Sequence, residues 1–147
     1  MTHTERRRRT FELVAAWHRA LLVRTKGRPA SLGQGRRALV LETTGRRSGQ
    51  LRRVTLAYIA HGDGYMVLAS NYGKETPPAW WFNLQTEPDA EVLVAGRRVA
   101  VRAHDAEGDE RAALVPRVQR ANAHWRSYLT DTRREIPFVV LARRATV

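Results

Sequence analysis

The sequence contains no cysteine, which excludes disulfide bonds, thiolate metal sites, iron–sulfur clusters and cysteine nucleophiles. It has no run of about 18 apolar residues, the length that a membrane-spanning helix needs. Its N-terminus lacks the apolar region and small-residue cleavage site of a signal peptide. We therefore expect a cytoplasmic protein whose redox chemistry, if it has any, comes from a bound cofactor.

Patterns for metal and hydrolytic chemistry are also missing. The five histidines, at positions 3, 18, 61, 104 and 124, include no pair at metal-ligand spacing, so we predict no metal site. No Gly-x-Ser-x-Gly elbow occurs. The segment Gly45–Gly49 (GRRSG) follows a predicted strand but enters another strand, so it is neither a dinucleotide fingerprint nor a P-loop.

The charge is strongly positive and unevenly distributed. Basic residues number 26, of which 24 are arginine, against 14 acidic residues, for a net charge of +12. Residues 1–53 carry a net charge of +11 and residues 54–147 only +1. Such a surface attracts nucleic acid, an anionic membrane or a polyanionic small molecule, and guanidinium groups suit phosphate and carboxylate. The alternative is an ordinary solubilising surface.

The length is that of one domain, and we divide it into a basic amphipathic helix and loop (1–35) and a β-rich body (36–147). The predicted strands are Ala38–Thr43, Leu51–Ala60, Tyr65–Ser70, Ala90–Ala95, Arg98–Ala103 and Ile136–Ala142, and the predicted helices lie within Thr4–Arg24, Ala79–Gln85 and Asp109–Asn122. Pro116 should kink or interrupt the last helix. Hairpin-linked strands with few helices indicate an α+β, mainly β fold, a closed or partly closed barrel with peripheral helices.

Three segments are candidate sites. Two glycines bracket Arg46, Arg47 and Ser48, so guanidinium groups, backbone amides and a hydroxyl could converge on one anion; a solvated turn is the alternative. Small residues at Ala69–Lys74 would let a flat ring approach the backbone beside the aromatic segment Ala79–Leu84, whose tryptophans could instead be core. Tyr128 could donate a proton or simply anchor its segment.

Four motifs in this order resemble the deazaflavin (F420)-dependent nitroreductase and F420H2-dependent quinone reductase family of split β-barrel oxidoreductases. They are TTGRRSGQLRRVTL (43–56), LASNYGK (68–74), PAWWFNL (78–84) and YLTDTRREIPFVVL (128–141). The resemblance implies an FMN-binding-barrel-like fold that binds coenzyme F420, a 5-deazaflavin with a phosphate and a polyglutamate tail. Such a ligand would account for the charge asymmetry.

The resemblance also assigns roles to residues. Arg46, Arg47, Ser48 and Arg52 would hold the phosphate and tail, Arg53, Val54, Thr55, Leu56, Ala57, Leu68, Ala69, Ser70 and Asn71 would line the ring, and Ala79, Trp80, Trp81, Phe82 and Asn83 would close the groove, with Lys74 and Trp125 near it. Tyr128 is the candidate catalytic proton donor. Asn122 and Trp125 depart from the family pattern, which often has tyrosine at these positions, so Tyr128 is the only phenol left there.

The implied activity is hydride transfer from the reduced deazaflavin to an electron-poor acceptor such as a quinone, a nitroaromatic or an activated alkene. Two alternatives stay open: an FMN-binding split-barrel oxidoreductase and a nucleic-acid-binding basic β-barrel, although we expect no nucleic acid partner. The basic helix could rest on the inner face of the cell membrane as a peripheral contact. Both a monomer and a homodimer are compatible with the sequence.

Overall fold

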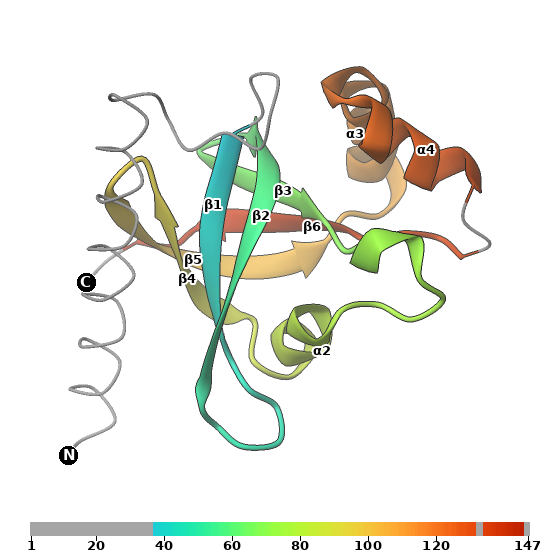
Figure 1. The fold of residues 1–147 in the computed structure, drawn as a ribbon. Helices are drawn as coiled ribbons and strands as arrows, with labels where there is room; N and C mark the ends of the chain where they lie inside the picture. Colours follow the sequence, from blue (N-terminus) through green and yellow to red (C-terminus); the bar gives the residue numbers. More distant parts are fainter. Residues whose placement is uncertain (1–36, 132–133, 146–147) are drawn as a thin grey trace, which may run out of the picture.

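A computed structural model describes residues 37–131 and 134–145 of the 147-residue chain as a six-stranded antiparallel barrel with helices beside it (Figure 1). The strands are β1 (Arg37–Thr44), β2 (Leu51–His61), β3 (Gly64–Leu68), β4 (Asp89–Val94), β5 (Arg97–Asp105) and β6 (Phe138–Arg143). Their order is β1-β2-β3-β6-β5-β4, and β4 pairs with β1 to close the barrel. The predicted fold class is confirmed, and each predicted strand overlaps one of the six.

Three helices and one short turn of 3-10 helix connect the strands: η1 (Asn71–Gly73), α2 (Ala79–Thr86), α3 (Gly108–Ala121) and α4 (Ala123–Asp131). The predictions of α2 and α3 are confirmed, whereas α4 was not predicted. The predicted helix within Thr4–Arg24, and the whole segment 1–35, lie outside the described residues. In the described part of the chain, every helix is too short or too polar to cross a membrane.

Pro116 lies inside α3, which is one continuous element, so the predicted interruption is wrong at this position. The break comes six residues later, at Asn122, whose backbone is extended. The Oδ1 atom of Asn122 accepts the backbone N–H of Trp125 at 2.8 Å, the bond of a helix N-cap. Asn122 therefore ends α3 and starts α4.

The core has two parts, one on each face of the β-sheet. Strand β6 shows the division, because Val139 and Leu141 belong to the cluster that includes Leu41 and Trp80, whereas Phe138 and Val140 belong to the other cluster. This second cluster includes Leu114 and Val118 of α3 and Trp125 of α4. Both faces of β6 are buried, as its almost unbroken apolar sequence predicts.

Polar contacts hold α3 against the barrel. Glu110 accepts hydrogen bonds from Nε2 of His61 (3.1 Å) and Nε2 of His104 (2.7 Å), and these bonds lower the pKa of Glu110. The guanidinium of Arg111 lies 4.0 Å from the ring centroid of Phe138 and donates to the backbone oxygen of Ile136. These contacts fix the helix pair at one end of the site described below.

The barrel is split between β2 and β3. Strand β2 pairs with β1 from Leu51 to Tyr58, but within the described residues it pairs with β3 only from Ile59 to His61. On an antiparallel strand, successive residues direct their N–H and C=O groups to alternate sides. Half of the backbone groups of residues 51–58 therefore face the split rather than a neighbouring strand.

Candidate functional site

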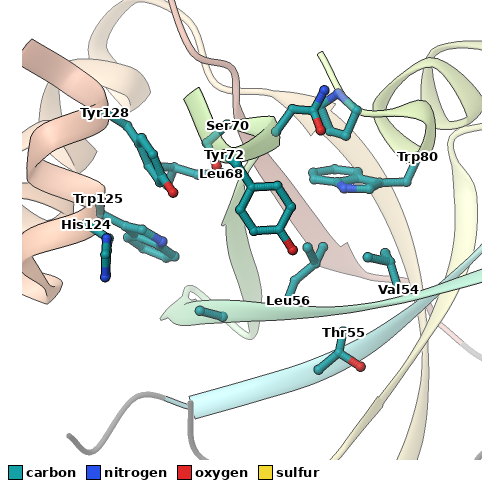
Figure 2. A pocket seen from close by; sticks show the side chains of 13 residues that line it. Val54, Thr55, Leu56, Leu68, Ser70, Tyr72, Trp80, His124, Trp125 and Tyr128 are labelled. Carbon is teal, nitrogen blue, oxygen red and sulfur yellow. The ribbon is translucent and has the colours of Figure 1, made fainter. Parts of the chain in front are cut away.

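A pocket of about 380 Å³ occupies the split, between β2 on one side and η1, α2 and α4 around it (Figure 2). Its lining comes from four regions: Val54, Thr55, Leu56 and Ala57 of β2; Leu68, Ser70, Asn71 and Tyr72; Pro78 and Trp80; and His124, Trp125 and Tyr128 of α4. The volume lies within the range of small-molecule sites, about 300 to 1,000 Å³. The aromatic side chains and the split edge of β2 together suit a flat ring that carries hydrogen-bonding atoms.

The pocket loop, residues 69–74, is held by an arginine that lies 60 or more residues away in the sequence. Arg134 donates from Nη2 to the backbone oxygens of Ala69 and Ser70, and from Nε to that of Lys74, each at 2.9 Å. Burial lowers the pKa of Arg134. A further hydrogen bond, from Nδ2 of Asn71 to the backbone oxygen of Thr76, holds the other side of the loop. The loop is therefore fixed from two directions.

Tyr72 stands out within this loop. Its backbone is left-handed, with φ of 56° and ψ of 30°, and its side chain is 86% exposed. Asn71 (φ 47°) and Gly73 (φ 78°) on either side are also left-handed. A tyrosine in this region costs about 1 to 3 kcal/mol and persists only where the surroundings enforce it.

The arginine turn, residues 45–50 between β1 and β2, is tied to α2 by a buried amide. Asn83 is 5% exposed; its Oδ1 accepts the backbone N–H of Arg46, and its Nδ2 donates to Oγ1 of Thr43, both at 3.1 Å. The Arg46 guanidinium lies 4.5 Å from the ring centroid of Phe82. A Cβ atom on Gly45 would lie 3.0 Å from both the oxygen of Gln50 and Oγ of Ser48, so the turn has little room for a larger residue.

The structure brings ten of the predicted site residues into the pocket: Val54, Thr55, Leu56, Ala57, Leu68, Ser70, Asn71, Trp80, Trp125 and Tyr128. The exposed Arg46, Arg47, Ser48, Arg52 and Arg53 lie outside it, on the arginine turn and the adjoining part of β2. Lys74 and Ala79 are exposed and Ala69 is buried, and none of the three lines the pocket.

The predicted site residues of α2 lie in different surroundings. Trp80 both lines the pocket and packs in the core, whereas the indole N–H of Trp81 donates to Asp105 at 3.2 Å. Phe82 lies beneath Arg46, and Asn83 anchors the turn instead of lining the pocket.

The predicted site residues do not include three lining residues, Tyr72, Pro78 and His124, or the clamp formed by Arg134. Tyr72 lies within the candidate segment Ala69–Lys74 and Pro78 within the motif at 78–84, but neither was given a role. The asparagine cap at position 122 could have revealed α4 and with it His124. Among the described residues, no group of three or more His, Asp or Glu side chains could hold a metal ion.

The fold is a split β-barrel that also occurs in solved proteins of low sequence identity. A pyridoxamine 5'-phosphate oxidase-related, FMN binding protein from Nostoc punctiforme PCC 73102 matches with a TM-score of 0.50 over 72% of this chain and 71% of that chain, at 11% identity. This likeness shows the architecture alone.

Closer relatives define the family. The sequence model of F420H(2)-dependent quinone reductases matches residues 7–143. The chain is 38% identical over 113 residues to the F420H(2)-dependent quinone reductase Rv1261c of Mycobacterium tuberculosis (strain ATCC 25618 / H37Rv), covering 73% of this chain and 74% of that protein. A solved F420-H2 dependent reductase (FDR-A) is 30% identical, with a TM-score of 0.63 over 70% of this chain and 92% of that chain. The protein therefore belongs to the F420H2-dependent quinone reductase family, an oxidoreductase family, and neither the FMN nor the nucleic-acid alternative is favoured.

Proposed function

We propose that this protein is an F420H2-dependent reductase that binds coenzyme F420 at the split and reduces an electron-poor acceptor, in the first place a quinone. The observation that carries the proposal is the pocket itself, a space of about 380 Å³. Several aromatic side chains surround it, together with the edge of β2 that has no strand partner in the described part of the chain. Membership of the F420H2-dependent quinone reductase family indicates that the flat ring bound there is the deazaflavin of F420.

The residues present fit this cofactor. Backbone groups of Val54–Ala57 on the split edge are available to the polar atoms of a deazaflavin ring. The exposed arginines 46, 47 and 52 lie on the hairpin that leads to this edge, where they can hold a phosphate and a polyglutamate tail. The reduced deazaflavin supplies a hydride from its C5 atom.

The protein's own contribution is positioning and exclusion of water. Trp80 and Trp125 are buried and provide apolar walls, which limit the access of water to the ring. Tyr128 is partly buried and lines the same pocket, which supports its assignment as the proton donor to the reduced acceptor. Solvent is the alternative source of this proton.

The proposal is tested by cofactor titration of the double variant Arg46→Ala, Arg47→Ala. Trp80 and Trp125 line the pocket, so quenching of intrinsic fluorescence reports binding. Each lost charge-assisted contact is worth about 1.5 to 3 kcal/mol, so we expect the Kd for F420 to rise about 100-fold or more.

The chain offers a matched control. Gly96-Arg97-Arg98, at the β4–β5 turn, repeats the Gly-Arg-Arg sequence of the arginine turn, but this turn joins two strands that contribute no residue to the pocket. Arg97→Ala with Arg98→Ala removes the same charge and should leave the Kd nearly unchanged. Equal Kd values for both double variants would contradict the role of the arginine turn, and tighter quenching of the wild type by FMN than by F420 would contradict the cofactor.

Three properties stay predictions: a cytoplasmic location, contact of residues 1–35 with the inner membrane face, and the choice between monomer and homodimer.

A further inference from the structure

Tyr72 combines features that packing does not explain. In the described part of the chain it is the only large hydrophobic side chain that is exposed, and it occupies a backbone conformation that tyrosine rarely adopts. It is the middle residue of three in succession with positive φ. A glycine would fit this position without strain, so the ring itself is what the strained backbone presents.

The loop that presents the ring is not loosely attached. The three hydrogen bonds from Arg134 fix the carbonyls on both sides of Tyr72, at Ala69, Ser70 and Lys74. Backbone bonds from Gly73 to Ser70 and from Lys74 to Asn71 close the turn around it. Strain that is held in place so firmly is typical of a functional position.

The ring stands at the pocket. Figure 2 shows it between Trp80 on one side and Trp125 and Tyr128 on the other, close to Leu56 of β2, and all five residues line the same space. Trp80 and Trp125 are buried in the two cores, whereas Tyr72 as a residue is 86% exposed. Tyr72 is therefore an aromatic lining residue with ample surface left for a ligand.

We propose that Tyr72 is a specificity-determining residue that stacks on the ring of the electron acceptor and favours planar, fused-ring quinones over single-ring ones. The inference rests on the proposed function, in which the split edge of β2 and the arginine turn hold the cofactor. That arrangement leaves the exposed end of the pocket, where Tyr72 stands, for the acceptor. Stacking gains with overlap area, and the face of an aromatic ring pairs well with an electron-poor quinone.

The test compares Tyr72→Gly with Tyr72→Phe and the wild type, using menadione as the two-ring quinone and 1,4-benzoquinone as the one-ring quinone. For Tyr72→Gly we expect the KM for menadione to rise about tenfold, with a much smaller rise for benzoquinone. The Kd for F420 should stay unchanged. Tyr72→Phe keeps the ring and should behave as the wild type with both quinones.

Thermal unfolding separates this role from a structural one. Glycine accepts a positive φ, so Tyr72→Gly should unfold at the same or a higher temperature than the wild type, although its KM rises. A lower Tm accompanied by proportional loss with both quinones would show a structural role and overturn the inference.

Other outcomes overturn it in distinct ways. An unchanged KM for menadione in Tyr72→Gly excludes stacking on the acceptor, and a raised Kd for F420 assigns the ring to the cofactor instead. A Tyr72→Phe variant as impaired as Tyr72→Gly assigns the role to the hydroxyl. If the wild type neither binds F420 nor oxidises F420H2 with any quinone, the proposed function fails and this inference with it, whereas an active wild type with unaffected variants rejects this inference alone.

Discussion

Replacing Asn83 should weaken both the fold and the cofactor site, because this one side chain joins α2 to the arginine turn. It donates to Thr43, which is 1% exposed, and accepts from the backbone of Arg46. In Asn83→Leu both bonds are lost, at about 0.5 to 1.5 kcal/mol each, and the buried Thr43 hydroxyl loses its donor. We expect a loss of about 2 to 4 kcal/mol in the free energy of unfolding, a factor of about 30 to 1,000 in the folded-to-unfolded ratio.

The measurement is urea unfolding followed by tryptophan fluorescence, with Gln85→Ala as the control. Gln85 carries an amide on the same helix but is exposed, so its removal should change stability by less than about 0.5 kcal/mol. Because the turn would lose its link to α2, the Kd of Asn83→Leu for F420 should also rise. The Kd of Gln85→Ala should not.

A double-mutant cycle isolates the buried contact. In Thr43→Val the hydroxyl is replaced by a methyl group of similar size, so combining it with Asn83→Leu removes both polar partners together. The double variant should be more stable than the sum of the two single losses predicts, by about 1 kcal/mol. Additive losses, or an unchanged urea midpoint in Asn83→Leu, would refute the reasoning.

Two further predictions concern the other polar anchors. Arg134→Met should lower stability by about 1.5 to 3 kcal/mol and speed hydrogen exchange in the pocket loop, whereas Arg143→Met, an exposed arginine on β6, should do neither; equal exchange in both would contradict the clamp. Hydrogen bonds from His104 and then His61 hold the pKa of Glu110 below its ordinary value, so their stabilisation is complete above the unfolded-state pKa of about 4.3 and is lost as the pH falls through the folded-state pKa. Glu110→Gln should therefore have a lower urea midpoint than the wild type at about pH 6, and the difference between the two midpoints should shrink toward about pH 3. Asp109→Asn on the same helix end should show little difference throughout, and a constant gap for Glu110→Gln would contradict the linkage.

The sequence by itself determined the barrel. Alternating apolar residues between glycine-containing turns define hairpins locally, so β1–β2 and β4–β5 could be predicted from neighbours in the chain. The buried β6 was predictable from a different local pattern, its unbroken apolar run, since only a strand covered on both faces tolerates Phe138–Leu141. The concentration of arginine before residue 54 can likewise be read directly from the sequence.

Only the tertiary structure decided where the barrel splits and what surrounds the split. Strand register between β2 and β3 depends on packing at many distant positions, and no local pattern limits their pairing to Ile59–His61. The short helix α2 has apolar residues on several sides, so its sequence did not show that Trp80 faces the pocket and Trp81 faces Asp105. The clamp of Arg134 joins residues 60 or more positions apart around the left-handed backbone of Tyr72, and a contact of that separation leaves no periodic trace in the sequence.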